Sequence, residues 1–281
     1  LGSDCEAPDE ALRDKSEKII EKLSEAGKAN LAAYIVSRKL ILDLLQRKLE
    51  IHGEEKRALE EAVHKLIFPM RKTSDEVDYE SQNLWVIDER LAYHHYLASD
   101  KPLKSVPPSG SASPKEPDLI VFNRPIALTD RADSEVAESI AILEFKRPGE
   151  KCGVGKTPVD QILDYIDEII AGKAQSRLRR TIYASVATSF FGYVICDIDP
   201  QLDRVLGRLQ MIATPDGKGR YGYFKDQRAY IEVLSYDKVL GDAGKRNRIL
   251  FDKLQIPALP PEAKLPIQTS TENGRSKPSN K

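Results

Sequence analysis

One short apolar segment ends in a carboxylate that is followed, two residues later, by an ammonium group. It reads Ile140-Ala-Ile-Leu-Glu144-Phe-Lys146, and strand alternation predicts that Glu144 and Lys146 project from one face. Burying both charges is costly unless they pair, bind a metal, or do both. An earlier apolar segment opens with Pro117-Asp118 and supplies a second carboxylate that could point at the first. Two carboxylates within reach repel, and a divalent cation is the simplest way to keep both ionised.

A third group follows on a predicted helix. The helix begins near Pro158, and its apolar residues recur at i, i+3, i+4, i+7 and i+8, namely Ile162, Tyr165, Ile166, Ile169 and Ile170. Gln161 and Tyr165 lie one turn apart on it and are expected on the same side. The helix is therefore expected to present an amide and a phenol side by side.

These elements resemble the PD-(D/E)XK nucleases. Pro117-Asp118 and Glu144-Phe145-Lys146 match the motif that names the class, and Gln161-Ile-Leu-Asp-Tyr165 matches the QxxxY motif of its RecB-like and lambda-exonuclease-like branch. The resemblance covers about residues 83 to 200. It implies an α/β fold, with a restriction-endonuclease-like core around a central mixed sheet and a helical region before it.

The resemblance also implies a role for each residue. Asp118, Glu144 and the Phe145 carbonyl would bind one or two Mg²⁺ or Mn²⁺ ions, because hard cations take oxygen ligands. The metal would activate a water and neutralise phosphate charge. Lys146 would orient that water and stabilise the developing negative charge. Gln161 and Tyr165 would position the site or the substrate. The expected reaction is hydrolysis of nucleic-acid phosphodiesters, with DNA preferred over RNA as the partner.

A further metal ligand is expected from the helix ahead of the first strand. Glu89, in Asp88-Glu89-Arg90, is the first choice, and His94 or His95 is the substitute. Adjacent helical residues point about 100° apart and cannot share one ion. The alternative is that Glu89 forms an ion pair with an arginine and has no part in chemistry.

Basic residues near the motifs could hold phosphates. Taken singly, each is also compatible with an ordinary solvated side chain. The candidates for nucleic-acid binding are Arg147, Lys151, Lys156, Lys173 and Arg177.

Three regions are predicted along the chain. Residues 1–75 read as helices with apolar stripes, with a helix end at Gly27 and one stripe formed by Leu42, Leu45 and Leu49. Residues 76–256 form the nuclease-like domain, and 257–281 read as a disordered tail. Within the domain, a Pro- and Ser-rich stretch from Ser99 to Pro117 predicts an exposed loop. The expected strands are 118–122, 140–146, 193–198, 206–213, 220–224 and 229–234, and a last helix is expected at 237–254.

Composition limits the partners and the compartment. The formal net charge is −1, so any nucleic-acid surface must be a local basic patch. The three cysteines are too few and too scattered for a disulfide framework or a zinc site. A reducing cytoplasm is therefore predicted, and the chain has no apolar run that could span a bilayer.

A second hypothesis belongs to a different class. The near-neutral charge and the long helical region would also suit a non-cleaving nucleic-acid-binding or assembly module of a larger complex. Those helices could join two copies in a homodimer. Asn83 to Leu97 resembles large bacterial ATP-binding proteins of the Hsp90-like ATPase class, some with nuclease-like C-terminal regions. That resemblance implies an antiviral defence role for a chain that is one part of a larger protein.

Overall fold

A mixed seven-stranded sheet organises the protein. The structure is a computed structural model that describes residues 15–16, 18, 22, 24–50, 56–106, 111–123, 136–171 and 183–256. The predicted tail at 257–281 lies outside these residues. The strands are β1 (Tyr96–Ser99), β2 (Leu119–Asn123), β3 (Val136–Phe145), β4 (Tyr183–Ile195), β5 (Ile212–Ala213), β6 (Gly219–Phe224) and β7 (Ala229–Leu234).

The sheet order is β1-β2-β3-β4-β7-β6-β5. Strands β1, β2 and β3 are antiparallel neighbours, whereas β4 runs parallel to both β3 and β7. A parallel neighbour requires a crossover connection, and α4 (Pro158–Ala171) provides it between β3 and β4. The α/β class and the central mixed sheet are therefore confirmed.

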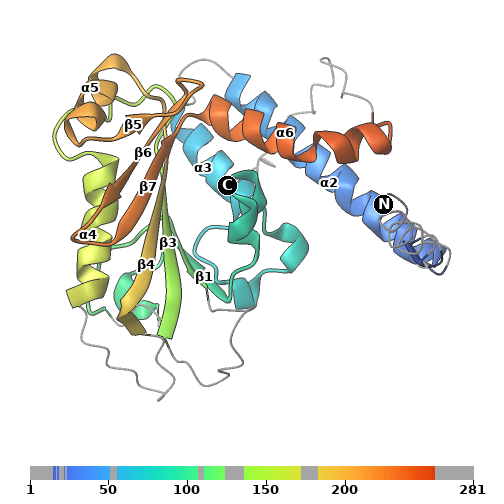
Figure 1. Ribbon diagram of the computed structural model, residues 1–281, viewed down its shortest axis with the longest axis horizontal. Coiled ribbons are helices and arrows are strands. Elements are labelled where there is room, and N and C mark those ends of the chain that lie inside the picture. Colours follow the sequence, from blue (N-terminus) through green and yellow to red (C-terminus); the bar gives the residue numbers. More distant parts are fainter. Residues whose placement is uncertain are drawn as a thin grey trace, which may run out of the picture.

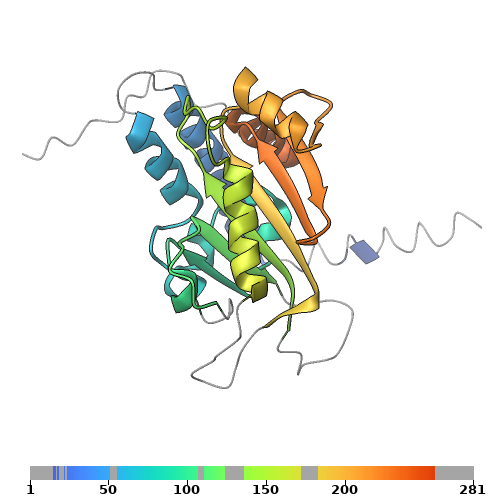
Figure 2. The same ribbon diagram turned by 90° about the vertical axis from the view of Figure 1, so that its left-hand side faces the viewer.

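Helices pack on both faces of the sheet (Figures 1 and 2). α4 lies across one face, while α3 and α6 lie on the other side with α2 beyond them. Their bounds are α2 (Glu25–Glu50), α3 (Lys56–Ile67), α5 (Pro200–Arg208) and α6 (Tyr236–Lys253). Short 3₁₀ turns connect α3 to the sheet and follow β1, at Ser74–Glu76, Tyr79–Ser81, Leu84–Val86, Glu89–Ala92 and Leu103–Ser105. None of the helices in these described stretches is long and apolar enough to cross a membrane.

Two hydrophobic cores follow from strand alternation. Ile140 and Ile142 of β3 face the core under α4, and Ala141 and Leu143 face the core under α3 and α6. The second core also contains Leu42 and Leu45 of α2 and Val63 and Ile67 of α3. The N-terminal helices thus share a core with the sheet, and the predicted stripe of α2 packs inside the molecule.

The stretch from Ser99 to Pro117 is not the exposed loop predicted from its composition. Leu103 and Val106 are buried in the core under α4, and Ser113 accepts a backbone hydrogen bond from Lys104. Strand β1, which precedes this stretch, was missed because four residues leave little periodicity to detect. The structure therefore corrects the prediction for the described part, 99–106 and 111–117.

Two other predicted elements are wrong. The strand expected at 206–213 is present only at its end, as β5 (Ile212–Ala213). Residues 200–208 form helix α5 instead, which Asp199 caps by accepting from the N–H groups of Gln201 and Leu202. The predicted helix end at Gly27 is also wrong, because α2 starts at Glu25. The Gly27 N–H donates to Ser24 Oγ at 3.0 Å, so Ser24 caps the helix in the way an N-cap serine does.

Candidate active site

The strand register brings the two carboxylates together. Leu119 of β2 pairs with Leu143 of β3, so the next antiparallel pair is Asp118 with Glu144. Directly opposite residues have Cβ atoms roughly 5 Å apart. The Phe145 N–H donates to Asp118 Oδ2 at 2.7 Å, which fixes the Asp118 side chain against the end of β3. The predicted meeting of Asp118 and Glu144 is therefore present in the structure.

Lys146 and Gln161 complete a connected group around Glu144. Lys146 Nζ donates to Glu144 Oε1 at 2.6 Å and to Gln161 Oε1 at 3.2 Å. Gln161 Nε2 donates to the same Glu144 oxygen at 2.6 Å and to the Tyr165 hydroxyl at 2.8 Å. The Tyr165 hydroxyl in turn donates to the Glu116 carbonyl at 3.0 Å. Helix α4 thereby links β3 to the segment that carries Asp118.

Helix α4 is held in place at its first turn. The Thr157 N–H donates to Asp160 Oδ2 at 2.9 Å, and the Asp160 N–H donates to Thr157 Oγ1 at 3.1 Å. This reciprocal capping satisfies donors that the first turn would otherwise leave unpaired. Gln161 follows in the same turn, so the cap also fixes the backbone position from which the Gln161 amide contacts Glu144.

Burial makes the two carboxylates hard to ionise together. Desolvation and then the neighbouring Glu144 raise the pKa of Asp118 to about 8. Desolvation also raises the pKa of Glu144, although Lys146 opposes this. Burial disfavours charge on Lys146, but the Glu144 carboxylate outweighs it and raises the pKa of Lys146. Like charges in a desolvated site favour protonation unless a cation is present.

One oxygen of the site has no hydrogen-bond partner among the described residues. It is Glu144 Oε2, which is buried. Buried polar atoms without a partner are uncommon and point to a missing ligand or ion. A divalent cation would satisfy this oxygen and reduce the repulsion between Asp118 and Glu144, so these residues fit a hard metal ion. Phe145, whose carbonyl is the third predicted ligand, is buried beside them.

Helix α3 brings two residues to the site that the sequence reasoning did not select. Glu60 lies close enough to Glu144 to help raise its pKa, and His64, one turn later, stacks on Phe145 with ring centroids 5.1 Å apart. Ligand atoms of His64, Asp100 and Asp118 lie within 4.8 Å of one another. Desolvation lowers the pKa of His64, which favours the neutral imidazole that a metal requires. The sequence signal that could have identified them is their spacing, because Glu60 and His64 are four residues apart on a helix ahead of the first strand.

Glu89 lies in a different cluster. Its carboxylate receives Arg38 Nη2 at 2.5 Å and Arg38 Nη1 at 3.2 Å. Arg38 comes from α2, and its Nη1 also donates to Asn247 of α6 at 3.0 Å. In the part of the chain that is described, none of the Glu89 contacts is to Asp118 or Glu144. The geometry favours the ion-pair interpretation of Glu89.

The two neighbouring histidines also differ from the predicted ligands. His94 is half-buried and its Nδ1 lies 3.0 Å from the Leu91 carbonyl, whereas His95 is exposed. Neither belongs to the group formed by His64, Asp100 and Asp118. The α-helix ahead of the first strand is α3, whereas Glu89 lies in the 3₁₀ turn Glu89–Ala92 and the two histidines follow that turn.

The predicted phosphate-binding residues are only partly close to the site. Arg147 follows Lys146 directly and contacts Glu150 at 3.0 Å and Glu60 at 3.9 Å. Lys151 is exposed, and Lys156 is exposed and paired with Asp164. Lys173 and Arg177 lie outside the described residues. Three of the five predicted cations are thus placed, all in the segment between β3 and α4.

Comparisons with known proteins add no further assignment. No family model, no curated protein and no solved structure matches the chain.

Proposed function

We propose that the protein is a divalent-metal-dependent nuclease that hydrolyses DNA phosphodiester bonds. The observation that supports this most directly is the group formed by Asp118, Glu144 and Lys146, with a buried oxygen of Glu144 that has no described partner. A site that gathers carboxylates and a lysine around a place for a cation suits phosphodiester hydrolysis. RNA is the second choice of substrate.

The fold supports a restriction-endonuclease-like core. The carboxylates lie on antiparallel neighbours β2 and β3, and the helix with Gln161 and Tyr165 crosses from β3 to the parallel strand β4. This is the order that the PD-(D/E)XK motifs require if all of them are to meet at one sheet edge. The contacts of Gln161 with Glu144 and Lys146 support the RecB-like and lambda-exonuclease-like assignment.

Each residue has a defined task under this proposal. Asp118, Glu144 and the Phe145 carbonyl would hold Mg²⁺ or Mn²⁺, and His64 and Asp100 are placed to extend that ligand set beside Asp118. When bound, the metal would supply an activated water and neutralise phosphate charge. The Glu144 carboxylate raises the pKa of Lys146, so its ammonium group would stabilise the charge that develops on the phosphate. Gln161 holds the side chains of Lys146 and Glu144 in position through hydrogen bonds to both.

The first experiment is a cleavage assay with linear and circular DNA, single- and double-stranded, and with RNA. Each substrate is incubated with Mg²⁺, Mn²⁺ or EDTA. Lys146→Ala is expected to lower the cleavage rate by about 10²-fold or more, which is typical for loss of a charge-stabilising group. Lys245→Ala, which removes a side chain that is 75% exposed on α6, is the matched control and should cleave at the original rate.

The outcomes separate the alternatives. Metal-dependent cleavage that disappears in Lys146→Ala supports the nuclease, and preference for linear over circular DNA indicates an exonuclease. A folded chain that cleaves nothing with either metal would refute the proposal. Binding of DNA without cleavage would move the assignment to a non-cleaving binding module.

A role in assembly has one observation in its favour. Apolar side chains on α2 are exposed, with Leu31 59%, Val36 48% and Leu40 47% accessible. Under this reading, Glu144→Ala would keep the cellular phenotype. The second test of assembly makes exposed apolar residues of α2 polar. The stripe Leu42, Leu45 and Leu49 is unsuitable for it because Leu42 and Leu45 are in the core. Leu31→Ser with Leu40→Ser is the appropriate change, and loss of the complex would support assembly and a part in a larger, ATPase-containing defence protein.

A further inference from the structure

A second surface with binding chemistry lies on the sheet face opposite α4. Strand pairing places Phe191, Tyr230 and Tyr223 in one row across β4, β7 and β6. The next row on the same face contains Tyr193, Glu232 and Tyr221. We call these six residues the aromatic face. Tyr230 is the central ring, with centroid distances of 6.5 Å to Phe191 and 6.2 Å to Tyr221.

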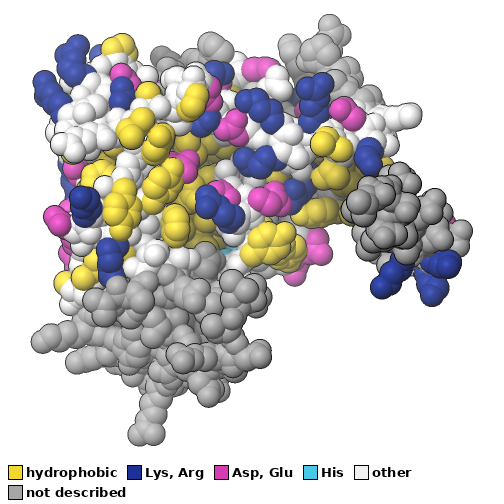
Figure 3. All heavy atoms as spheres, viewed as in Figure 1, with side chains coloured by type: hydrophobic (Ala, Val, Ile, Leu, Met, Phe, Trp, Pro, Cys, Tyr) yellow, Lys and Arg dark blue, Asp and Glu magenta, His cyan; other side chains and the backbone are white. Residues whose placement is uncertain are grey.

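The aromatic face is only partly covered. Phe191, Tyr221 and Tyr230 are half-buried, and Tyr223 is 61% exposed. Ile212 of β5 pairs with Tyr221 and extends the row with a side chain that is 57% exposed. Figure 3 shows hydrophobic side chains gathered over these strands. A contiguous exposed apolar surface of this kind commonly marks an interaction site.

A carboxylate lies at the centre of this surface. Glu232 is partly buried between Tyr193 and Tyr221, and burial raises its pKa, although hydrogen bonding to Tyr230 opposes the rise. Within the described part of the chain, no cation comes within ion-pair distance of its oxygens. A carboxylate that is removed from water and left without a cation is unfavourable unless a partner supplies one.

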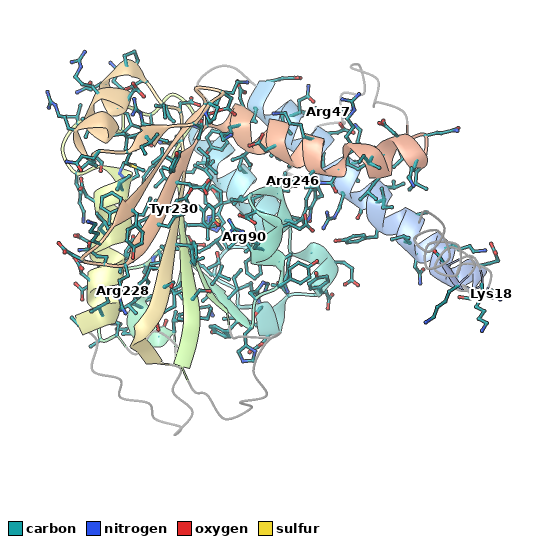
Figure 4. All side chains as sticks on the ribbon, viewed as in Figure 1. Lys18, Arg47, Arg90, Arg228, Tyr230 and Arg246 are labelled. Carbon is teal, nitrogen blue, oxygen red and sulfur yellow. The ribbon has the colours of Figure 1, made fainter. Side chains whose placement is uncertain are left out.

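The charged groups near Glu232 are already engaged elsewhere. Arg90, which lies beside Tyr230 in Figure 4, donates from Nε to both oxygens of Asp88 at 3.0 Å. Lys238 pairs with Asp216 at 2.7 Å and Asp242 at 2.9 Å. Asp88 raises the pKa of Glu232, whereas Arg90 and Lys238 lower it. Both of these cations form their ion pairs with other carboxylates, so neither pairs directly with Glu232.

We propose that the aromatic face binds a protein partner through an arginine or lysine side chain that contacts the Tyr230 ring and pairs with Glu232. A guanidinium or ammonium group is attracted to the face of an aromatic ring. Its alkyl stem packs on neighbouring apolar surface while the charge meets the carboxylate. Arginine is the better ligand of the two, because its planar group stacks on aromatic rings and is more weakly hydrated.

Charge favours a cationic protein segment over single-stranded nucleic acid, the other class of ligand that aromatic surfaces bind. Single-stranded nucleic acid stacks its bases on aromatic side chains but needs cations for its phosphates. Here the central charged group is a carboxylate, and the adjacent arginine is neutralised by Asp88. A cationic protein segment gains from both the rings and the carboxylate, whereas a polyanion is repelled by Glu232.

The test uses a hexaarginine peptide as probe and a hexacitrulline peptide as its neutral isostere. Binding is measured by isothermal titration in EDTA, so that nuclease activity has no influence. The wild-type chain is expected to bind hexaarginine at least about tenfold more tightly than hexacitrulline. Glu232→Gln and Tyr230→Ala should each weaken hexaarginine binding by about tenfold. Glu80→Gln removes an exposed carboxylate from another part of the molecule and should leave it unchanged.

Three results would overturn the proposal. The first is equal hexaarginine binding by wild type and Glu232→Gln, a substitution of nearly the same shape that keeps the fold. The second is binding of a twenty-residue oligothymidylate that Tyr230→Ala abolishes, which would assign the surface to nucleic acid. The third is a concentration-dependent dimer that Tyr223→Ser dissociates, which would assign it to a second copy of the chain.

Discussion

The carboxylates of Asp118 and Glu144 lie close together in a buried site, an arrangement that lowers the stability of the folded chain when both are ionised. The two carboxylates face each other across β2 and β3. Burial and then the neighbouring Glu144 raise the pKa of Asp118, and burial raises the pKa of Glu144. An unfolded aspartate releases its proton near pH 3.9, whereas folded Asp118 retains it up to about pH 8. Between these values the folded state binds more protons, so stability falls as pH rises.

The fall of stability with rising pH leads to a prediction for thermal unfolding. In EDTA, the Tm of the protein should fall as the pH is raised from 5 to 8, and Asp118→Asn should remove at least about 3 °C of that fall. The asparagine still accepts the Phe145 N–H, so the backbone contact is kept. Mg²⁺ should raise the Tm of the wild type at pH 8, because it binds the ionised carboxylates.

The control replaces a carboxylate that is 71% exposed on α6, in Asp252→Asn. Its Tm should follow the wild type at every pH. Parallel pH profiles for wild type and Asp118→Asn would show that the raised pKa of Asp118 does not affect folding.

At the level of elements, α6 is bonded directly to the residue that follows strand β3. The buried Tyr236 hydroxyl, in the first turn of α6, donates to the Lys146 carbonyl at 2.6 Å. Tyr236→Phe would leave that carbonyl without this donor, at a cost of about 1–3 kcal/mol in the free energy of unfolding. If the nuclease proposal holds, the turnover number should also fall about tenfold, because small displacements of a reacting group are costly.

Chemical denaturation and cleavage at saturating DNA measure the two effects of Tyr236→Phe. Tyr79→Phe is a matched control, since that side chain is 53% exposed. A Tyr236→Phe protein with unchanged stability and turnover would mean that the contact does not position Lys146.

How well each element could be predicted depends on the strength of its local signal. The start of helix α4 and both bounds of strand β7 were predicted at their observed positions, because their apolar residues repeat at 3.6 and at two. Strand β1 and helix α5 were not predicted. The first has four residues, too few to show a periodicity. The second carries a local start signal, the Asp199 cap followed by Pro200, but it buries only Leu202 and Leu206 and so shows a weak apolar repeat.

For the whole molecule, one buried arginine connects three segments that are distant in sequence. Arg38 of α2 bonds to Glu89 and to Asn247 of α6, and its guanidinium lies 4.5 Å from the Trp85 ring centre. Arg246 of α6, marked in Figure 4, also donates to the carbonyls of Trp85 and Val86 at 2.9 Å. These contacts hold the helical region against the sheet domain.

Glu89→Gln should therefore destabilise the protein without affecting metal binding. Loss of the charge beside buried Arg38 should lower the free energy of unfolding by about 1–3 kcal/mol. Mg²⁺ affinity, measured by calorimetry, should stay at the wild-type value. Glu80→Gln should change neither quantity. A loss of Mg²⁺ binding in Glu89→Gln with normal stability would instead identify Glu89 as a ligand.

The sequence by itself determined the motif residues and the type of element that carries each one. Alternation put Glu144 and Lys146 on one strand face, and helical spacing put Gln161 and Tyr165 on one side of α4, because both patterns are local. Only the tertiary structure decided which distant segments complete the site. Glu60 and His64 come from a helix whose position depends on packing against β3. The Glu89 carboxylate, in contrast, is paired with Arg38 of α2. Such contacts join residues far apart in the chain, where no local periodicity records them.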